Sequence, residues 1–380
     1  MDYLTWSIPE DVSYELVIAK IPIKRAFRTS FGEFYGVRVF LISRSGDCIG
    51  AGEAPVDPYP LYSGEFVESV VEFTKKMKEH LFMSQNVKEL LSKLNSYRGN
   101  QMAKTMIEYS ILTLLSCLNN KSLVEAVGGR PYKLPVQESI GITEDLDELI
   151  SCAEEALNWG ARRLKVKIKP GWDVEPLKAL RHEFPGVQLL ADANGAYDPV
   201  RESHREQLSD VAAYADAIEQ PYPPGDLVSS AKLSSEEGIE VVLDESVDTP
   251  RRALEVAMLN EEFGSLLSIN VKPPRLGGLT ASLQVLDIAV DHNIPVFIGG
   301  LLETVIGRSL NMVVASAVKG PLEPSDFSPD QQFYERSLAK DPFDIKCGFV
   351  ELRDSPGLMF DIDWDYLESV TVEKIPLERG

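Results

Sequence analysis

The second half of this 380-residue chain repeats one pattern at nearly constant intervals, and that regularity restricts the fold more than any other feature of the sequence. Short apolar runs recur after residue 135, and each is followed by a polar stretch long enough for a helix. The polar residues that close five of the runs are 25, 27, 25 and 28 residues apart. One strand, one helix and two loops fill such a step, so the repetition predicts a (β/α) barrel. The expected strands are 137–142, 164–168, 188–191, 215–218, 240–243, 267–271 and 295–298.

A doubly wound open sheet would show a similar alternation of strands and helices. That architecture usually carries a GxGxxG turn after its first strand, and no such turn follows Ile142. The barrel is therefore the preferred interpretation, and its last unit need not be regular.

The chain outside the barrel has a different pattern on each side. Residues 13–54 alternate in the manner of strands and residues 63–127 have helical spacing, which together predict a small α+β unit. The tail again reads as strands. We expect three parts: an α+β capping domain at 1–133, a catalytic barrel at 134–345, and a C-terminal segment at 346–380 that packs back on the cap.

Charge and hydropathy argue against two kinds of partner. The formal net charge is −21 and the acids are spread along the chain, so a nucleic acid would be repelled and its binding is not expected. No apolar run reaches the roughly 18 residues that span a bilayer, and the N-terminus mixes acids with apolar side chains, unlike a signal peptide. An acidic protein that binds an acidic substrate needs a local cation, which can be a metal or inward-pointing lysines.

The four cysteines, Cys48, Cys117, Cys152 and Cys347, are far apart in the sequence. Their spacing matches neither a zinc knuckle nor a CxxC redox pair. We expect four reduced thiols and a cytoplasmic protein.

Carboxylates stand at the ends of three successive expected strands. Asp192, Glu219 and Asp244 close the third, fourth and fifth strands, counted from Gln137. A single acid in such a place is more often a helix cap, but strand ends at the carboxyl side of a barrel form its catalytic mouth. Three carboxylates on adjacent strands can converge on one hard cation, and such a set suits Mg²⁺ or Mn²⁺ better than zinc.

Lysines occupy the two opposite sides of the same mouth. Lys165 and Lys167 lie on the second expected strand and Lys272 closes the sixth, which is diametrically opposite in a ring of eight. A divalent cation on a substrate carboxylate would offset the charge of an enediolate. Lys165 and the metal would disfavour the charged form of Lys167 and so make it a base. The pattern predicts proton abstraction beside a carboxylate, followed by racemisation if Lys272 reprotonates the other face, or by elimination or isomerisation if it stays charged.

At these residues the sequence resembles the enolase superfamily, in its muconate-lactonising branch. The most similar group within that branch comprises the o-succinylbenzoate synthases and N-succinylamino acid racemases. The resemblance extends from about residue 15 to residue 365. The matching segments are 27–32, 165–173, 192–194, 219–221, 244–246, 270–272, 299–308 and 326–328.

This resemblance implies an N-terminal α+β capping domain, whose loop at 27–32 closes over the substrate, on a modified (β/α)7β barrel. It implies Mg²⁺, with Mn²⁺ as an option, at the three carboxylates, Lys167 and Lys272 as the acid–base pair, and Lys165 as an assisting group. It also implies a small carboxylate substrate and a homo-oligomer. The residues expected to contact the substrate are Phe27, Ser30, Ser139, Asn194, Arg275, Gly299, Gly300, Leu301 and Glu303.

Two activities are compatible with the resemblance. In a synthase, Lys167 would remove the proton α to the carboxylate and return it to the departing hydroxyl, while Lys272 stabilises the enediolate in a step of menaquinone biosynthesis. In a racemase, the two lysines would act as bases on opposite faces of an N-succinylamino acid. Arg275 matches an arginine that accompanies racemase activity in the family. Cycloisomerases and dipeptide epimerases share the scaffold and are less favoured.

Three positions depart from the family pattern. Leu301 and Val305 stand where methionine and glycine are usual, and Glu138 stands where small residues are usual. Val305 is expected to add bulk near the pocket. The resemblance therefore defines the metal chemistry more closely than it defines the substrate.

A barrel that binds a phosphorylated ligand without a metal is the alternative from another class. Two glycine pairs, 277–278 and 299–300, follow the sixth and seventh expected strands, where barrels often bind phosphate. Three carboxylates would repel a phosphate unless a metal lay between them, so sensitivity to a chelator distinguishes the two hypotheses.

Overall fold

The N-terminal unit is built on an antiparallel sheet. The computed structural model describes residues 2–24, 32–130 and 132–379. The strand order is β13-β1-β2-β3, so the last strand of the chain pairs with the first. The strands are β1 (Ser13–Lys20), β2 (Val37–Ser45), β3 (Cys48–Ala54) and β13 (Thr371–Leu377). The helices of this unit are η1 (Asp2–Thr5), α1 (Val67–Met83), α2 (Val87–Asn95), α3 (Gln101–Leu118) and α4 (Leu123–Ala126).

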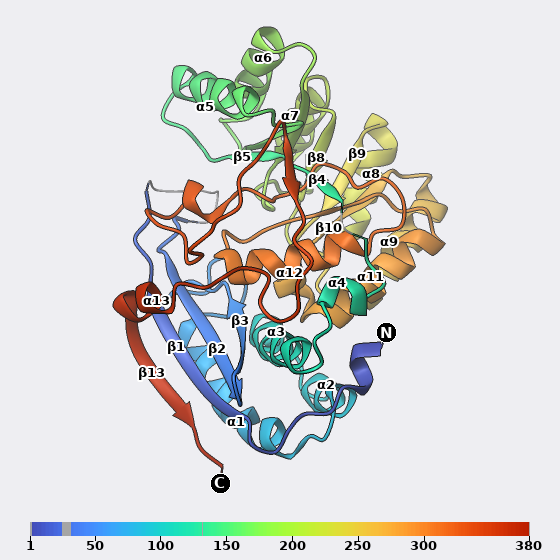
Figure 1. Ribbon diagram of the computed structural model, residues 1–380. Helices are drawn as coiled ribbons and strands as arrows, with labels where there is room; N and C mark the ends of the chain where they lie inside the picture. Colours follow the sequence, from blue (N-terminus) through green and yellow to red (C-terminus); the bar gives the residue numbers. More distant parts are fainter. Residues whose placement is uncertain (1, 25–31, 131, 380) are drawn as a thin grey trace.

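Helix α3 lies between this sheet and the barrel (Figure 1). Fifteen of its 18 residues are buried, because one side packs on β3 and another on the short barrel helix α10 (Pro273–Leu276). The approach to β3 requires glycine, since a Cβ on Gly52 would lie 2.0 Å from the carbonyl oxygen of Met106. Helix α3 therefore contributes to the hydrophobic core of the cap and also packs on the barrel.

Seven parallel strands form the second sheet, in the order β11-β10-β9-β8-β7-β6-β5. Neighbours in the sheet are neighbours in the sequence, unlike the reversing order of a doubly wound sheet. The strands are β5 (Glu138–Ile140), β6 (Arg163–Lys167), β7 (Gln188–Asp192), β8 (Ala217–Glu219), β9 (Glu240–Leu243), β10 (Leu267–Val271) and β11 (Val296–Ile298). The longer helices around them are α5 (Leu146–Asn158), α6 (Val174–Glu183), α7 (Glu202–Ala212), α8 (Leu227–Glu237), α9 (Pro250–Phe263), α11 (Leu279–Asp291) and α12 (Val305–Ser316).

An extended segment around Ser325 closes the ring in place of a regular eighth strand. The backbone nitrogen of Ser325 donates to the carbonyl oxygen of Pro135 at 3.0 Å, and that of Gln137 donates to the carbonyl oxygen of Ser325 at 3.0 Å. On the other side, the backbone nitrogen of Asp326 donates to the carbonyl oxygen of Ile298 at 2.9 Å. The predicted (β/α)7β barrel with an α+β cap is confirmed.

The C-terminal tail contacts both units. β12 (Phe349–Glu351) pairs with β4 (Lys133–Pro135), which precedes the first barrel strand, whereas β13 completes the cap sheet. The 3₁₀ helix η2 (Asp330–Gln332) precedes β12, and α13 (Trp364–Val370) precedes β13.

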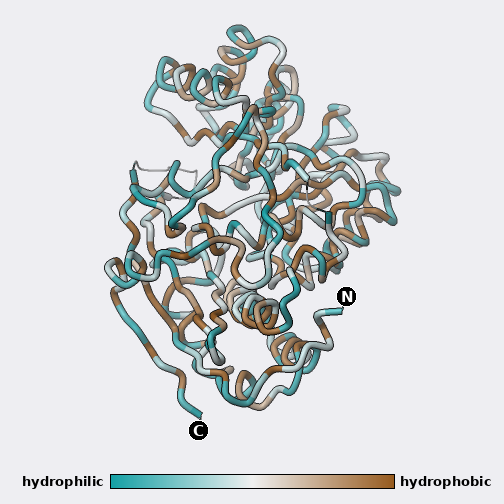
Figure 2. The backbone as a smooth tube through the Cα atoms, viewed as in Figure 1, coloured by the Kyte–Doolittle hydropathy of each residue, from teal (hydrophilic) through white to brown (hydrophobic). Residues whose placement is uncertain are grey.

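The hydropathy of the segments follows this layering. Hydrophobic and hydrophilic residues alternate along the peripheral helices in Figure 2, as expected for helices with one buried face. Within the ranges that the structure describes, no helix is long and apolar enough to cross a membrane.

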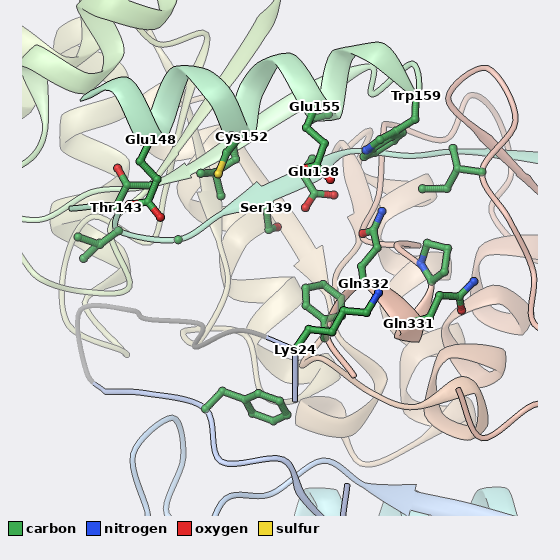
Figure 3. Close-up of a pocket in the computed structure, with 18 of the residues that line it drawn as sticks. Lys24, Glu138, Ser139, Thr143, Glu148, Cys152, Glu155, Trp159, Gln331 and Gln332 are labelled. Atoms are coloured by element: carbon green, nitrogen blue, oxygen red, sulfur yellow. The ribbon is translucent and has the colours of Figure 1, made fainter. Parts of the chain in front are cut away.

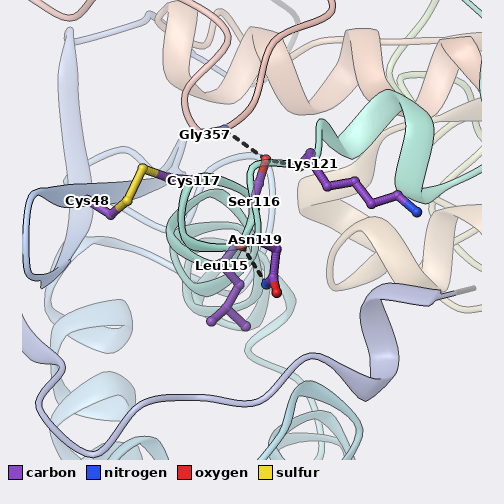
Figure 4. Close-up of a disulfide and its surroundings, with 7 residues drawn as sticks. All are labelled: Cys48, Leu115, Ser116, Cys117, Asn119, Lys121 and Gly357. Atoms are coloured by element: carbon purple, nitrogen blue, oxygen red, sulfur yellow. Dashed lines mark hydrogen bonds between the residues drawn. A yellow bond between two sulfur atoms is a disulfide. The ribbon is translucent and has the colours of Figure 1, made fainter.

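One expectation about the cysteines is wrong. Cys48 on β3 and Cys117 on α3 form a disulfide, with their Cα atoms 5.8 Å apart (Figure 4). They are 69 residues apart in the sequence, and only the packing of β3 on α3 brings them together. Cys152 and Cys347 take part in no disulfide within the described chain, as expected.

Candidate active site

The barrel interior changes from apolar to charged towards the carboxyl ends of the strands. Alternate residues of a strand share one face, so the residues two positions before the predicted carboxylates point inward with them. These residues and Phe297 form an apolar cluster separate from the main core: Leu190, Ala217, Val242 and Phe297. The carboxylates of Asp192, Glu219 and Asp244 lie one pleat above this floor, and all three residues are 0% exposed.

The sheet register brings the predicted charged residues side by side. Lys167 lies opposite Asp192, and Asp192 lies opposite Glu219, across neighbouring strands. Asp244 follows β9, the next strand in the sheet. Among the residues that the structure describes, no three His, Cys, Asp or Glu side chains are arranged to hold a metal ion as they stand. Each of the three carboxylates instead lies within ion-pair distance of a lysine.

Each predicted lysine meets a carboxylate. Nζ of Lys167 lies 2.6 Å from Oδ2 of Asp192 and 2.7 Å from Oδ1 of Asn194. Nζ of Lys272 lies 2.8 Å from Oδ2 of Asp244. Burial would lower the pKa of Lys272, but Asp244 outweighs it and raises that pKa well above its usual value. The two lysines thus contact different carboxylates of one cluster, Lys167 from β6 and Lys272 from the end of β10.

The carboxylates differ in their electrostatic surroundings. Burial, with Asp192 nearby, raises the pKa of Glu219 to about 8. Its Oε1 accepts a hydrogen bond from Nδ2 of Asn270 at 2.6 Å, whereas Oε2 has no hydrogen-bond partner in the described part of the chain. Burial also acts on Asp244, but Lys272 and Arg275 oppose it and lower the pKa of Asp244 to about 2.

Asp326, on the segment that closes the ring, belongs to this cluster, although the sequence analysis assigned it no role. Its carboxylate accepts hydrogen bonds from Nζ of Lys165 at 2.8 Å, Nε2 of Gln137 at 2.8 Å and Oγ of Ser139 at 3.0 Å. Burial would raise the pKa of Asp326, but Lys165 holds it well below its usual range. Asp326 follows the seventh expected strand, at the place where an eighth barrel strand would end. This position is the sequence signal that could have identified it as a site residue.

Tyr62 also belongs to this cluster, although it was not predicted from the sequence. It lies in the cap segment between β3 and α1, and its hydroxyl is 3.3 Å from Oδ1 of Asp244. Nζ of Lys272 lies 5.1 Å from the centre of its ring. No strand or helix pattern marks a single tyrosine in a connecting segment, so the cap docking alone reveals it.

A small cavity of about 100 Å³ lies where these side chains meet the cap. The predicted substrate residues Ser139, Asn194, Gly300 and Leu301 line it. The lysines and further lining residues are Lys165, Lys167, Lys272, Gly32, Glu33, Phe34, Pro55, Asp57, Tyr62, Leu302, Arg308, Asp326, Ser328 and Phe333. Phe27 and Ser30, also predicted to contact the substrate, lie outside the described residues.

Three other predicted contacts, Arg275, Glu303 and Gly299, are not among the described residues that line this cavity. Arg275 donates to the carbonyl oxygen of Val247 at 2.9 Å and to Asp244. Glu303 is 0% exposed and lies 3.3 Å from Arg308. Gly299 adjoins Lys272, whose Cε would be 2.8 Å from a Cβ placed there.

A larger cavity of about 970 Å³ adjoins the first and shares Phe34, Ser139 and Phe333 with it. In Figure 3, α5 contributes Glu148, Cys152 and Glu155 from one side, and Lys24, Gln331 and Gln332 lie on the other. Glu138 lines this larger cavity, and its Oε2 accepts a hydrogen bond from Oγ of Ser328 at 3.1 Å. Val305 is fully buried at the start of α12 and is not among the described residues that line either cavity. The expectation that its side chain adds bulk at the pocket is therefore not supported.

Known proteins resemble this chain over almost its full length. The family described as “Enolase C-terminal domain-like” matches residues 148–366. The N-succinylamino acid racemase of Thermus thermophilus is 32% identical over 94% of this chain and 96% of its own. The o-succinylbenzoate synthase of Geobacillus kaustophilus is 32% identical over 95% of this chain and 96% of its own.

Solved structures show the same arrangement of cap and barrel. An enolase superfamily member from Listeria innocua superposes with a TM-score of 0.86 at 25% identity, covering 98% of this chain and 99% of that one. Sequence family, full-length relatives and fold agree with the cluster of lysines and carboxylates at the barrel mouth. The chain therefore belongs to the enolase superfamily, in the group that contains the o-succinylbenzoate synthases and the N-succinylamino acid racemases.

Proposed function

We propose that this protein is a metal-dependent enzyme that removes the proton next to a substrate carboxylate. We further propose that it is an o-succinylbenzoate synthase, which forms its product by dehydration. The observation that carries the proposal is the convergence of Lys167 and Lys272. They come from strands four positions apart in the sheet and line the same cavity of about 100 Å³. A substrate carbon held between them would have an amine on each face.

The proposed metal is Mg²⁺, or Mn²⁺, held by Asp192, Glu219 and Asp244. The residues fit such an ion, because all three are buried and would offer carboxylate oxygens, the ligands that Mg²⁺ prefers. Oε2 of Glu219 accepts no hydrogen bond in the described chain and has only the ammonium of Lys165 at 3.6 Å, so it could take a cation as a further partner. When bound, the ion would supply positive charge against the second negative charge that develops on the substrate carboxylate.

Lys167 is the proposed base for proton abstraction. Asn194 accepts a hydrogen bond from its Nζ and so orients that group towards the cavity. Lys165, two residues earlier on the same face of β6, is held by Asp326 as a fixed positive charge. Lys167 would then return the proton to the departing hydroxyl, while Lys272 remains an ammonium and stabilises the enediolate.

An N-succinylamino acid racemase is the second candidate, because the same two lysines can act as bases on opposite faces of a carbon. Relatives with either name are equally similar to this chain, at 32% identity. The choice between the two activities depends on the substrate that the cavities accept.

The proposed substrate is a small carboxylate whose remaining atoms extend into the cavity of about 970 Å³. A role in menaquinone biosynthesis, a cytoplasmic location and homo-oligomeric assembly accompany this proposal as predictions. The division into a cap at 1–133, a barrel at 134–345 and a C-terminal segment at 346–380 also stays a prediction.

The test compares kcat/KM for two substrates in the presence of Mg²⁺: the cyclohexadiene precursor of o-succinylbenzoate and an N-succinylamino acid. The larger value identifies the main activity. Excess EDTA should abolish both reactions. Turnover that persists in EDTA would refute the metal proposal and favour the metal-free barrel.

The variant Lys272→Arg separates the two roles of Lys272. Arginine keeps the positive charge but cannot accept a proton at neutral pH, so racemisation should fall by roughly a hundredfold or more while part of the dehydration survives. Lys319→Arg is the matched control, since Lys319 is exposed and pairs with Asp287. Racemisation that is unaffected by Lys272→Arg would contradict the two-base role.

A further inference from the structure

A buried glutamate of the cap holds the start of barrel helix α12. Glu53 lies on β3 and is 2% exposed. Its Oε2 accepts hydrogen bonds from Oγ1 of Thr304 at 2.6 Å and from the backbone nitrogen of Gly307 at 2.9 Å. Thr304 is the N-cap of α12 and Gly307 lies in its first turn, where backbone donors lack partners within the helix. The cap thus supplies a helix cap to the barrel.

Arg38 on the neighbouring strand β2 holds the loop that precedes the same helix. Its Nη2 donates to the carbonyl oxygens of Leu301 at 2.9 Å and Leu302 at 3.0 Å. Its Nε lies 3.3 Å from Oε1 of Glu53, so the two cap residues form one charge pair. The hydroxyl of Tyr334 also donates to the carbonyl oxygen of Leu302, at 2.9 Å.

The loop needs such support because its backbone is unfavourable. Leu302 has a backbone φ of +56°, a conformation that residues other than glycine rarely adopt. Leu301 and Leu302 both line the cavity of about 100 Å³. The guanidinium of Arg38 also lies 4.6 Å from the ring centre of Phe34, another lining residue.

We propose that Arg38 and Glu53 are positioning residues, which fix the cavity wall formed by Leu301 and Leu302 from the cap side. The docked cap thereby sets the shape of the pocket through the backbone of a barrel loop. Neither residue lines the described cavity, so neither is assigned contact with the substrate. The effect on turnover rests on the proposed function, whereas the effect on the loop does not.

A purely structural role at the cap–barrel interface is the competing explanation. Tyr109 on α3 provides a matched comparison, since its hydroxyl lies 2.8 Å from Oγ of Ser309 on α12. Tyr109→Phe and Tyr334→Phe each remove one buried hydroxyl that contacts the α12 region. Of these two tyrosines, only Tyr334 has a hydrogen bond to the Leu301–Leu302 wall among the described residues.

The experiment compares wild type with Arg38→Lys, Tyr334→Phe, their double variant and Tyr109→Phe. Lysine keeps the charge of Arg38 but lacks the planar fork that serves the carbonyls and Glu53 together. Hydrogen–deuterium exchange of residues 300–307 should accelerate about tenfold in Arg38→Lys and in Tyr334→Phe. KM for the better substrate should rise about tenfold with kcat within about threefold, because the wall affects binding.

The two wall variants should also be coupled, so that the double variant changes KM by less than the product of the single effects. Exchange and KM that stay at wild-type values in Arg38→Lys would overturn the proposal. The same holds if Tyr109→Phe reproduces the effects of Tyr334→Phe. A wild-type enzyme inactive with both substrates would refute the proposed function alone, and the exchange of residues 300–307 would then decide the positioning role.

Discussion

Replacing Glu108 with glutamine should change how the stability of this protein depends on pH. Glu108 lies on α3, is 1% exposed, and its Oε1 accepts a hydrogen bond from the backbone nitrogen of Thr280 at 3.0 Å. Burial raises the pKa of Glu108 from 4.5 to about 7, although the hydrogen bonds from Thr280 act in the opposite direction. Its Oε2 has no hydrogen-bond partner among the residues that are described.

The sign of the effect follows from the order in which the two states lose the proton. Below pH 4.5 the carboxyl of Glu108 is protonated in both states, and its stabilising contribution is fully present. As the pH rises, the unfolded chain ionises first, so the free energy of unfolding falls until the folded protein ionises near pH 7. A shift of two to three pKa units corresponds to a loss on the order of 3 kcal/mol.

Urea unfolding of wild type and Glu108→Gln at pH 5 and pH 8 measures this loss. Glutamine does not titrate, so the variant should gain about 2.5 kcal/mol relative to wild type between the two pH values, since part of the loss already occurs below pH 5. Glu72→Gln on α1 is the control, because Glu72 is exposed and its replacement should leave the pH dependence unchanged. A stability difference between wild type and Glu108→Gln that is constant with pH would refute the reasoning.

Three further predictions concern packing and charge. Cys48→Ser should lower the free energy of unfolding by about 4 kcal/mol, as expected for a bond that closes 69 residues of chain, and added reductant should do the same to wild type. Asp326→Asn should lower kcat by roughly tenfold or more, because it leaves a buried lysine without its carboxylate; unchanged kcat would remove Asp326 from the site. Gly52→Ala should destabilise the protein by about 2 kcal/mol or more, since its Cβ would strike the backbone of Met106, whereas Gly64→Ala, with open space around it, should not.

The sequence predicted the barrel and its charged mouth because both depend on local patterns. The expected strands 240–243 and 267–271 agree with β9 and β10 residue for residue. Alternation within a strand then places a residue and its second neighbour on one face. Residues that close barrel strands at the carboxyl end face the mouth, so Asp192 and Lys167 could be assigned to the interior before any contact was known.

What the sequence did not predict depends on contacts between distant segments. Tyr62 reaches Asp244 only because the cap docks on the barrel, and Asp326 meets Lys165 only because an irregular segment closes the ring. Arg275 is near the site, as expected, but it contacts Asp244 and is not among the described residues that line the small cavity. The periodicity of a sequence does not reveal such contacts, since each joins two side chains that are more than thirty residues apart in the chain.

Helix α3, with most of its length enclosed, limits how a substrate can enter. Swinging the entire N-terminal unit away would expose a hydrophobic surface that water solvates poorly. Admission of a ligand therefore has to rely on short rearrangements at the rim, while the two bodies stay joined. The same enclosure should make them melt as one cooperative unit, with a single calorimetric transition.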